Sequence, residues 1–191
     1  MFTYSKDLED PRGNYNFLWE YVAEKKIKTA IDIGAWWGPW TIWWSKYAER
    51  VEAFEPNPLM HKRLEHNFSQ HSNCFFHKVA LGDRKGDVSM SYKDHSGTNY
   101  VTKSKGDIPM HTLDDYNFNN VDIIKIDVEG YEIPVLEGAK KTIARDKPLI
   151  QIEANKSGHV YGRTKRDILN YLQDIGMKRL AKKWPDQIWS F

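Results

Sequence analysis

The residues of this sequence that could do chemistry stand in or directly after strand-like segments, which is where ligands bind in parallel α/β sheets. Asp32, Gly34 and Gly38 lie in and after the apolar run TAIDIG. Glycines there let a ligand approach the backbone at a helix N-terminus, and a carboxylate can meet a cation. Glu55 ends the next run, about 20 residues beyond Gly34, where an acidic residue can accept hydrogen bonds from ribose hydroxyls.

The third strand-like run, CFFHKVALGD, ends in Leu81, Gly82 and Asp83, whose backbone amides and carboxylate could contact an adenine edge. These positions together predict a ligand that contains adenosine. A dinucleotide is disfavoured, because its fingerprint needs G-x-G-x-x-G and this chain has only Gly34-x-x-x-Gly38. The wider Asp-x-Gly-x-x-x-Gly spacing is similar to the first motif of S-adenosylmethionine-dependent methyltransferases.

A second group of ionisable residues occurs in the most strand-like stretch, VDIIKIDVEG. A strand that ran through it would point Lys125, Asp127 and Glu129 to one face. Asp127 would then face the methyl group of the cofactor, and could act as general base on an acceptor hydroxyl or hold a divalent cation. The alternative is a salt bridge between Lys125 and one carboxylate that only ties down the strand.

A parallel sheet must bring these residues together, and strand-length apolar runs alternate with helical segments over about residues 27–153. The 191 residues fit a single domain. We expect a covering helix within 1–26, a cofactor-binding core over 27–155, and a helix with a hairpin over 163–191. Within the core we expect helices over 58–68 and 133–143, strands over 74–83, 88–92 and 147–155, a polar loop over 93–107, and a turn or short helix over 111–116.

The segments IDIGAWWGPW, VEAFEPNP, VALGD, HTLDDY and IIKIDVEGYEIPVLEGA together resemble the FkbM-type methyltransferases, over about residues 30–153. The resemblance implies an α/β, class I methyltransferase Rossmann-like fold, with a seven-stranded mostly parallel sheet, helices on both faces and a C-terminal antiparallel hairpin. It also implies that Asp32, Gly34 and Gly38 line the methionine end of the cofactor, that Glu55 holds its ribose, and that Asp83 lies near its adenine. The expected cofactor-binding residues are Asp32, Gly34, Trp36, Gly38, Glu55, Pro56, Asn57, Leu81, Gly82, Asp83 and Asp127, and the expected catalytic residues are Lys125, Asp127 and Glu129.

Five of the eight tryptophans lie within positions 36–44. Trp40, Trp43 and Trp44 have helical spacing, so we predict that at least two of them pack against the sheet. Trp36 precedes that helix, at a position where the family usually has a small or polar residue. We expect Trp36 to border the cofactor.

Charge and cysteine content limit the partners and the compartment. The 28 Lys and Arg nearly balance the 26 Asp and Glu, which gives no broad electrostatic reason for a nucleic-acid or membrane partner. We interpret Lys178, Arg179, Lys182 and Lys183 as a solvated strand face. The single cysteine, Cys74, excludes an internal disulfide, and the sequence starts without a secretory signal, so we expect a soluble cytoplasmic protein.

We therefore expect S-adenosylmethionine as cofactor, S-adenosylhomocysteine as product, and methyl transfer to a hydroxyl of a small-molecule or glycan acceptor. Loops 93–107 and 154–163, with the N-terminal helix, would form the acceptor site. Nucleic-acid acceptors are disfavoured, because DVEG stands where base methyltransferases need Asn or Asp followed by Pro-Pro and an aromatic residue. The oligomeric state has no signal in the sequence.

Two alternatives concern the same carboxylates. Asp127, Glu153 and Asn155 loosely resemble the oxygen ligands of metal-dependent catechol O-methyltransferases, which would suit magnesium. The spacing is not distinctive, however, and no metal is expected. A non-catalytic module that only binds an adenosine cofactor is the second alternative, and such a module would not need Lys125, Asp127 and Glu129.

Overall fold

The structure is a computed structural model that describes residues 18, 20–91, 99–102, 104, 106–154 and 157–191. Its centre is a seven-stranded sheet in the order β10-β11-β9-β8-β1-β2-β3. The parallel strands are β1 (Ile27–Ile33), β2 (Ala48–Phe54), β3 (Cys74–His77), β8 (Val121–Ile126) and β9 (Leu149–Glu153). β11 (Asp186–Ser190) runs antiparallel to β9 and forms a hairpin with β10 (Lys178–Lys183). The predicted mostly parallel sheet with a C-terminal hairpin is confirmed.

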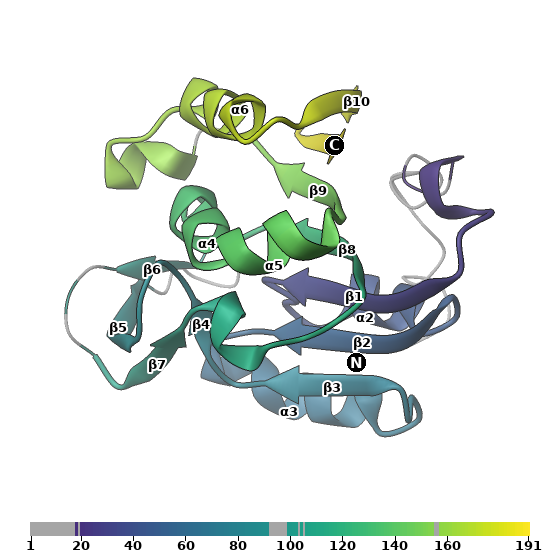
Figure 1. Ribbon diagram of the computed structural model, residues 1–191. Coiled ribbons are helices and arrows are strands. Elements are labelled where there is room, and N and C mark those ends of the chain that lie inside the picture. Colours follow the sequence, from purple (N-terminus) through teal and green to yellow (C-terminus); the bar gives the residue numbers. More distant parts are fainter. Residues whose placement is uncertain (1–17, 19, 92–98, 103, 105, 155–156) are drawn as a thin grey trace.

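Helices cover both faces of this sheet (Figure 1). On one face lie α4 (Glu132–Gly138) and α5 (Lys140–Asp146), and on the other lie α2 (Pro39–Trp44) and α3 (Pro58–Phe68). The chain also forms α6 (Lys165–Asp174) and the short 3-10 helices η1 (Leu113–Tyr116) and η2 (Ser157–Tyr161). Because both faces are covered, most residues of the central strands are apolar, and Ile31, Ile124 and Ile150 are fully buried.

The tryptophan-rich helix packs as predicted. Trp44 is fully buried and Trp43 is nearly so, and both belong to an apolar cluster with Val51 and Ile123 of the sheet. Leu18 of the predicted N-terminal helix joins the same cluster. Residues 18 and 20–22 are helical, and the rest of that predicted helix lies outside the described residues.

A second, small sheet stands at the carboxyl ends of the main strands. The sequence predicted one of its strands, over 88–92, but did not predict the sheet. It has the order β4-β7-β5-β6, from β4 (Ala80–Leu81), β7 (Ile108–His111), β5 (Gly86–Ser91) and β6 (Tyr100–Thr102). The expectation of one strand over 74–83 was therefore wrong, because β3 and β4 belong to different sheets. The expected loop 93–107 was wrong in part, because β6 pairs with β5. This loop was expected to form part of the acceptor site, and its residues His95, Ser96 and Thr98 lie outside the described residues.

The predicted helix 133–143 is two helices, which meet at Ala139. The break comes directly after Gly138, where the α4 backbone lies against the backbone of Gly82. A Cβ atom on Gly138 would lie 1.9 Å from the carbonyl oxygen of Gly82. Other predicted helix limits are confirmed: α3 spans 58–68, and Asn57 caps it by accepting a hydrogen bond from the Leu59 amide (3.0 Å). Among the described helices, none is long and apolar enough to cross a membrane.

Candidate active site

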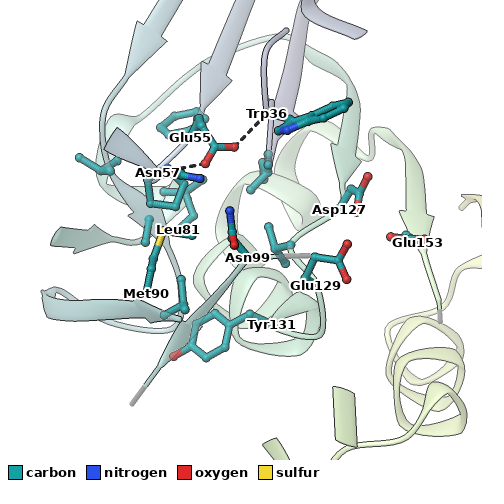
Figure 2. Close-up of a pocket in the computed structure, with 18 residues that line it drawn as sticks. Trp36, Glu55, Asn57, Leu81, Met90, Asn99, Asp127, Glu129, Tyr131 and Glu153 are labelled. Carbon is teal, nitrogen blue, oxygen red and sulfur yellow. Dashed lines mark hydrogen bonds between the residues drawn. The ribbon is translucent and has the colours of Figure 1, made fainter. Parts of the chain in front are cut away.

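A cavity of about 310 Å³ opens beyond the carboxyl ends of the central strands. The strand order reverses between β1 and β8, and a crevice at such a reversal is the usual ligand site of an open parallel sheet. Figure 2 shows two sides of this pocket, with Glu55, Asn57, Leu81 and Met90 on one and Asp127, Glu129 and Glu153 on the other. The lining residues are Ile33, Gly34, Trp36, Phe54, Glu55, Pro56, Asn57, Val79, Ala80, Leu81, Met90, Asn99, Val101, Asp127, Val128, Glu129, Tyr131 and Glu153.

The floor of the pocket is a backbone contact between the loops after β1 and β8. The Asp127 amide donates to the carbonyl oxygen of Ile33 (3.0 Å), and a Cβ atom on Gly34 would lie 1.8 Å from the Asp127 carbonyl oxygen. Gly34 also has φ 80°, in the left-handed region. Packing and backbone conformation therefore both require glycine at the first position of the predicted cofactor motif.

Glu55 lies in the pocket wall with its carboxylate held by two backbone amides. One oxygen accepts from the Trp36 amide (2.8 Å) and the other from the Asn57 amide (2.9 Å). Burial raises the pKa of Glu55 to about 7, although both hydrogen bonds act against the rise. Each carboxylate oxygen keeps a second lone pair, so Glu55 can still accept a hydroxyl hydrogen bond from a ligand.

Trp36 borders the pocket from the loop before α2. Its backbone has φ 53°, which is uncommon for a residue with a side chain, and its indole is 42% exposed. The hydrogen bond from its amide to Glu55 and a tilted contact with the Trp37 ring (5.6 Å between centroids) accompany this conformation. The indole of Trp36, at a position where the family resemblance led us to expect a small or polar residue, is thus part of the pocket wall.

Asp127, Glu129 and Glu153 form an acidic cluster on the opposite side of the pocket (Figure 2). One carboxylate oxygen from each lies within 4.8 Å of the others, close enough to share one divalent cation. Burial, a hydrogen bond to Asp127 and the negative charges nearby hold the pKa of Glu153 well above its ordinary value. Glu153 and Asp127 therefore share a proton more readily than two isolated carboxylates would.

The geometry that brings Glu129 into this cluster differs from the predicted one. β8 ends at Ile126, so the alternation of side chains does not extend to Glu129. Glu129 instead has φ 54° in a turn that is followed by Gly130 with φ 104°. Glu129 thus lines the pocket, as expected, but a turn directs its side chain there and not a continuation of the strand.

Lys125 lies outside the pocket lining and is buried beneath it. Its ammonium nitrogen is 3.4 Å from a carboxylate oxygen of Asp32 and 3.4 Å from one of Asp127. Burial alone would lower the pKa of Lys125, but the charges of Asp127 and Asp32 outweigh it and raise the pKa. Thr41 donates to the other oxygen of Asp32 (2.7 Å). Lys125 thus forms a salt bridge, which was the expected alternative to a catalytic role for this residue. The salt bridge positions the carboxylate of Asp127.

Four residues expected to bind the cofactor are absent from the pocket lining: Asp32, Gly38, Gly82 and Asp83. Asp32 is fully buried beneath the pocket, where it pairs with Lys125. A Cβ atom on Gly38 would lie 2.5 Å from the Phe68 ring, so this glycine lets α2 and α3 pack closely. Gly82 meets Met110 in the same way, at 2.6 Å. Asp83 is paired with Arg84 at 3.0 Å.

The structure adds pocket residues that the sequence did not single out, among them Met90, Val101 and Tyr131. Met90 and Val101 come from β5 and β6 of the small sheet. The position of these two strands depends on the pairing of β5 with β7 and of β6 with β5, which the sequence did not reveal. Tyr131 directly follows the DVEG segment, so proximity to that motif was a usable signal.

Comparison with known proteins identifies the fold and the family of this chain. The central sheet, the order of its strands and the position of the pocket define a class I S-adenosylmethionine-dependent methyltransferase fold. The model of the methyltransferase FkbM domain matches residues 32–178, so the chain belongs to the FkbM methyltransferase family. No curated protein matches the chain.

Solved structures agree on the fold. Methyltransferase FkbM from Methylobacillus flagellatus KT has 20% identity and a TM-score of 0.57, and the match covers 87% of this chain and 44% of that one. Precorrin-6y C5,15-methyltransferase from Geobacter metallireducens GS-15 has 13% identity and a TM-score of 0.60, with 100% and 94% covered. N-methyltransferase NodS from Bradyrhizobium japonicum WM9, in complex with S-adenosyl-L-homocysteine, has 10% identity and a TM-score of 0.57, with 97% and 89% covered. This chain therefore spans less than half of the FkbM structure, and relatives of its fold act on different acceptor atoms.

Proposed function

We propose that this protein is an S-adenosylmethionine-dependent methyltransferase that methylates a hydroxyl group on a carbohydrate-like or other small-molecule acceptor. The observation that carries the proposal is that Glu55 and the acidic cluster line one pocket from opposite sides. The single cysteine supports a reducing compartment, and we extend the proposal to a cytoplasmic protein.

The residues of the pocket fit the cofactor. Glu55 offers carboxylate lone pairs to ribose hydroxyls at a place where two amides fix its orientation. Leu81 and Met90 supply apolar surface beside it for an adenine ring. When bound, S-adenosylmethionine supplies an electrophilic methyl group on a sulfonium. An acidic wall opposite Glu55 suits that positive charge.

The carboxylate of Asp127 is placed to act as the base. An acceptor hydroxyl beside it can transfer its proton to the carboxylate while the hydroxyl oxygen bonds to the methyl carbon and the carbon–sulfur bond breaks. Lys125 contacts this carboxylate from below, at 3.4 Å, and Glu153 is hydrogen-bonded to it. Because protein groups complete this arrangement, we propose a base that works without a metal, so that chelation by EDTA leaves the transfer rate unchanged.

The test is isothermal titration with S-adenosylhomocysteine. Wild type is expected to bind with micromolar affinity, Glu55→Gln about tenfold more weakly, and Asp127→Asn within about threefold of wild type. Asp83→Asn is the matched control, because this carboxylate lies outside the pocket lining. Absence of binding by the folded wild type would refute the methyltransferase proposal.

A second measurement separates an enzyme from a binding module. Wild type and Asp127→Asn are incubated with methyl-labelled S-adenosylmethionine and a panel of mono- and oligosaccharides. Label transferred by wild type and lost about a hundredfold in Asp127→Asn supports base catalysis. Cofactor binding without transfer to any member of the panel would favour the non-catalytic alternative.

A further inference from the structure

The turn of the C-terminal hairpin borders the reactive side of the pocket. Trp184 and Pro185 form this turn, between β10 and β11. The carbonyl oxygen of Pro185 accepts a hydrogen bond from the Ala154 amide (3.2 Å), and Asp186 is paired with Glu153 in the sheet. Since Glu153 lines the pocket, an acceptor that extends past the acidic cluster meets this turn next.

Trp184 presents an exposed aromatic ring at this place. Its side chain is 59% exposed, the second-highest value among the large apolar side chains that lie at the surface in the described residues. The ammonium nitrogen of Lys165, the first residue of α6, lies 4.2 Å from the centroid of its ring. The flat apolar face of such a ring can pack against a sugar ring, and a cation beside it can attract a negative group on that sugar.

An irregularity in β10 brings two further cations to the same face of the sheet. The pairing of β10 with β11 shifts between Arg179 and Ala181, which makes Leu180 an extra residue in the strand. In a regular strand, positions 179 and 182 would point to opposite faces. The extra residue reverses this relation, so Arg179 and Lys182 point to one face.

That face is the one covered by α6. The guanidinium of Arg179 lies 6.0 Å from the ring of Trp189, which packs in the apolar cluster with Leu172 of α6. Together with partial burial, the positive charges of Lys182 and Arg179 lower the pKa of Lys165. The three cations therefore lie close enough to repel one another.

Neither Lys165, Arg179 nor Lys182 forms an ion pair with any residue that the structure describes. A bound anion would relieve their mutual repulsion. We call Lys165, Arg179, Lys182 and Trp184 the hairpin rim.

We propose that the hairpin rim binds the acceptor, and that the acceptor is a sugar that carries a carboxylate or phosphate group, with its ring on Trp184 and its anionic group on the three cations. This inference rests on the proposed function, because it names the acceptor of the same pocket. Two observations support it: the charge of the rim complements an anion, and the turn that carries Trp184 adjoins the pocket residue Glu153, because Asp186 pairs with Glu153 in the sheet.

The rim suits a small anionic sugar better than a nucleic acid. Single-stranded nucleic acids are bound by long positive grooves with several aromatic rings, on which successive bases stack. The rim has a single exposed ring and three cations at the end of one pocket, and the whole chain carries a formal net charge of only +2. A decamer of uridylate in the experiment below tests this choice.

The experiment measures binding of trigalacturonate and of the neutral trimer maltotriose to the full chain by isothermal titration at low salt. Trigalacturonate is expected to bind about tenfold more tightly, and added salt should reduce the difference. Lys165→Gln combined with Lys182→Gln should weaken trigalacturonate about tenfold, and Trp184→Ala should weaken both trimers. Glucose 6-phosphate, titrated in parallel, distinguishes a phosphate from a carboxylate.

The control is Lys140→Gln with Lys141→Gln, which changes the net charge equally at exposed positions of α5. Equal affinity for both trimers, or an equal loss in the control, would overturn the proposal, and so would tighter binding of the uridylate decamer. S-adenosylhomocysteine is titrated with the same variants and should bind them as it binds wild type. If S-adenosylhomocysteine does not bind wild type while the trimers bind as expected, the proposed function is refuted. The proposal that the hairpin rim binds an anionic sugar is then retained.

Discussion

A Cβ atom on Gly34 would lie 1.8 Å from the carbonyl oxygen of Asp127, so the loop that holds the cofactor motif and the loop that holds the acidic cluster meet backbone to backbone. Gly34→Ala must therefore separate β1 from β8 as well as strain a residue at φ 80°. We expect the free energy of unfolding, measured with urea, to fall by more than about 3 kcal/mol. Gly86→Ala is the control, because nothing lies within 4 Å of its Cβ position. Similar losses at the two sites would contradict the contact.

The buried ammonium of Lys125 lies between two carboxylates, and its removal should be costly. Lys125→Met keeps the length of the side chain but leaves Asp32 buried without its cation. We expect the free energy of unfolding to fall by about 3–5 kcal/mol. The exposed pair between Lys26 and Glu49 offers the comparison, since Lys26→Met should leave the urea midpoint unchanged. A tolerated Lys125→Met would mean that Asp127 and Asp32 do not depend on this ion pair.

The buried carboxylate of Glu55 should make cofactor affinity depend on pH. Because burial raises its pKa to about 7, Glu55 is ionised above this pH and protonated below it. Ribose hydroxyls need the ionised acceptor, so we expect S-adenosylhomocysteine to bind about tenfold more weakly at pH 6 than at pH 8. Glu55→Gln has no proton to gain, and its weaker binding should be flat over the same range. A pH dependence that survives in Glu55→Gln would assign the effect to another group.

Trp36 forms one wall of the pocket, and its indole should contribute to cofactor binding. Trp36→Ala removes the indole but keeps a Cβ atom on a residue with φ 53°. The strain of this left-handed backbone conformation is therefore similar in wild type and variant. We expect the affinity for S-adenosylhomocysteine to fall about fivefold. Tyr47→Ala serves as control, since Tyr47 is also 42% exposed but lies outside the pocket lining. Unchanged affinity in a folded Trp36→Ala protein would refute the role of Trp36.

Local patterns predicted much of the fold and half of the site. The alternation of apolar runs and helical segments predicted the main sheet, and the helix 58–68 was correct to the residue because Asn57 caps it. Glu55, Asp127 and Glu129 are in the pocket, as predicted. The small sheet was missed, because its strands have few residues and are stabilised by pairing between distant segments.

The site residues that the sequence predicted wrongly have the same explanation, because contacts between distant segments decide where their side chains lie. Gly38 and Gly82 have the spacing of ligand-contacting glycines, yet close packing against Phe68 and Met110 accounts for both. Asp83 is two residues beyond Leu81, the last residue of β4, and that small displacement takes its side chain out of the pocket lining. Spacing along the chain identifies a loop, but the direction of each side chain depends on what packs against it.

The amino-acid sequence by itself determined the class of fold and the family, because these depend on periodicity, capping residues and motifs that act over a few turns of chain. Only the tertiary structure decided which charges meet. Lys125 joins Asp32 to Asp127 across two strands, and Glu153 meets Asp127 from a third. One extra residue in β10 places Arg179 and Lys182 on the same face of the sheet. Electrostatic interactions fall off with distance in space, and strand pairing sets that distance between residues far apart in the chain.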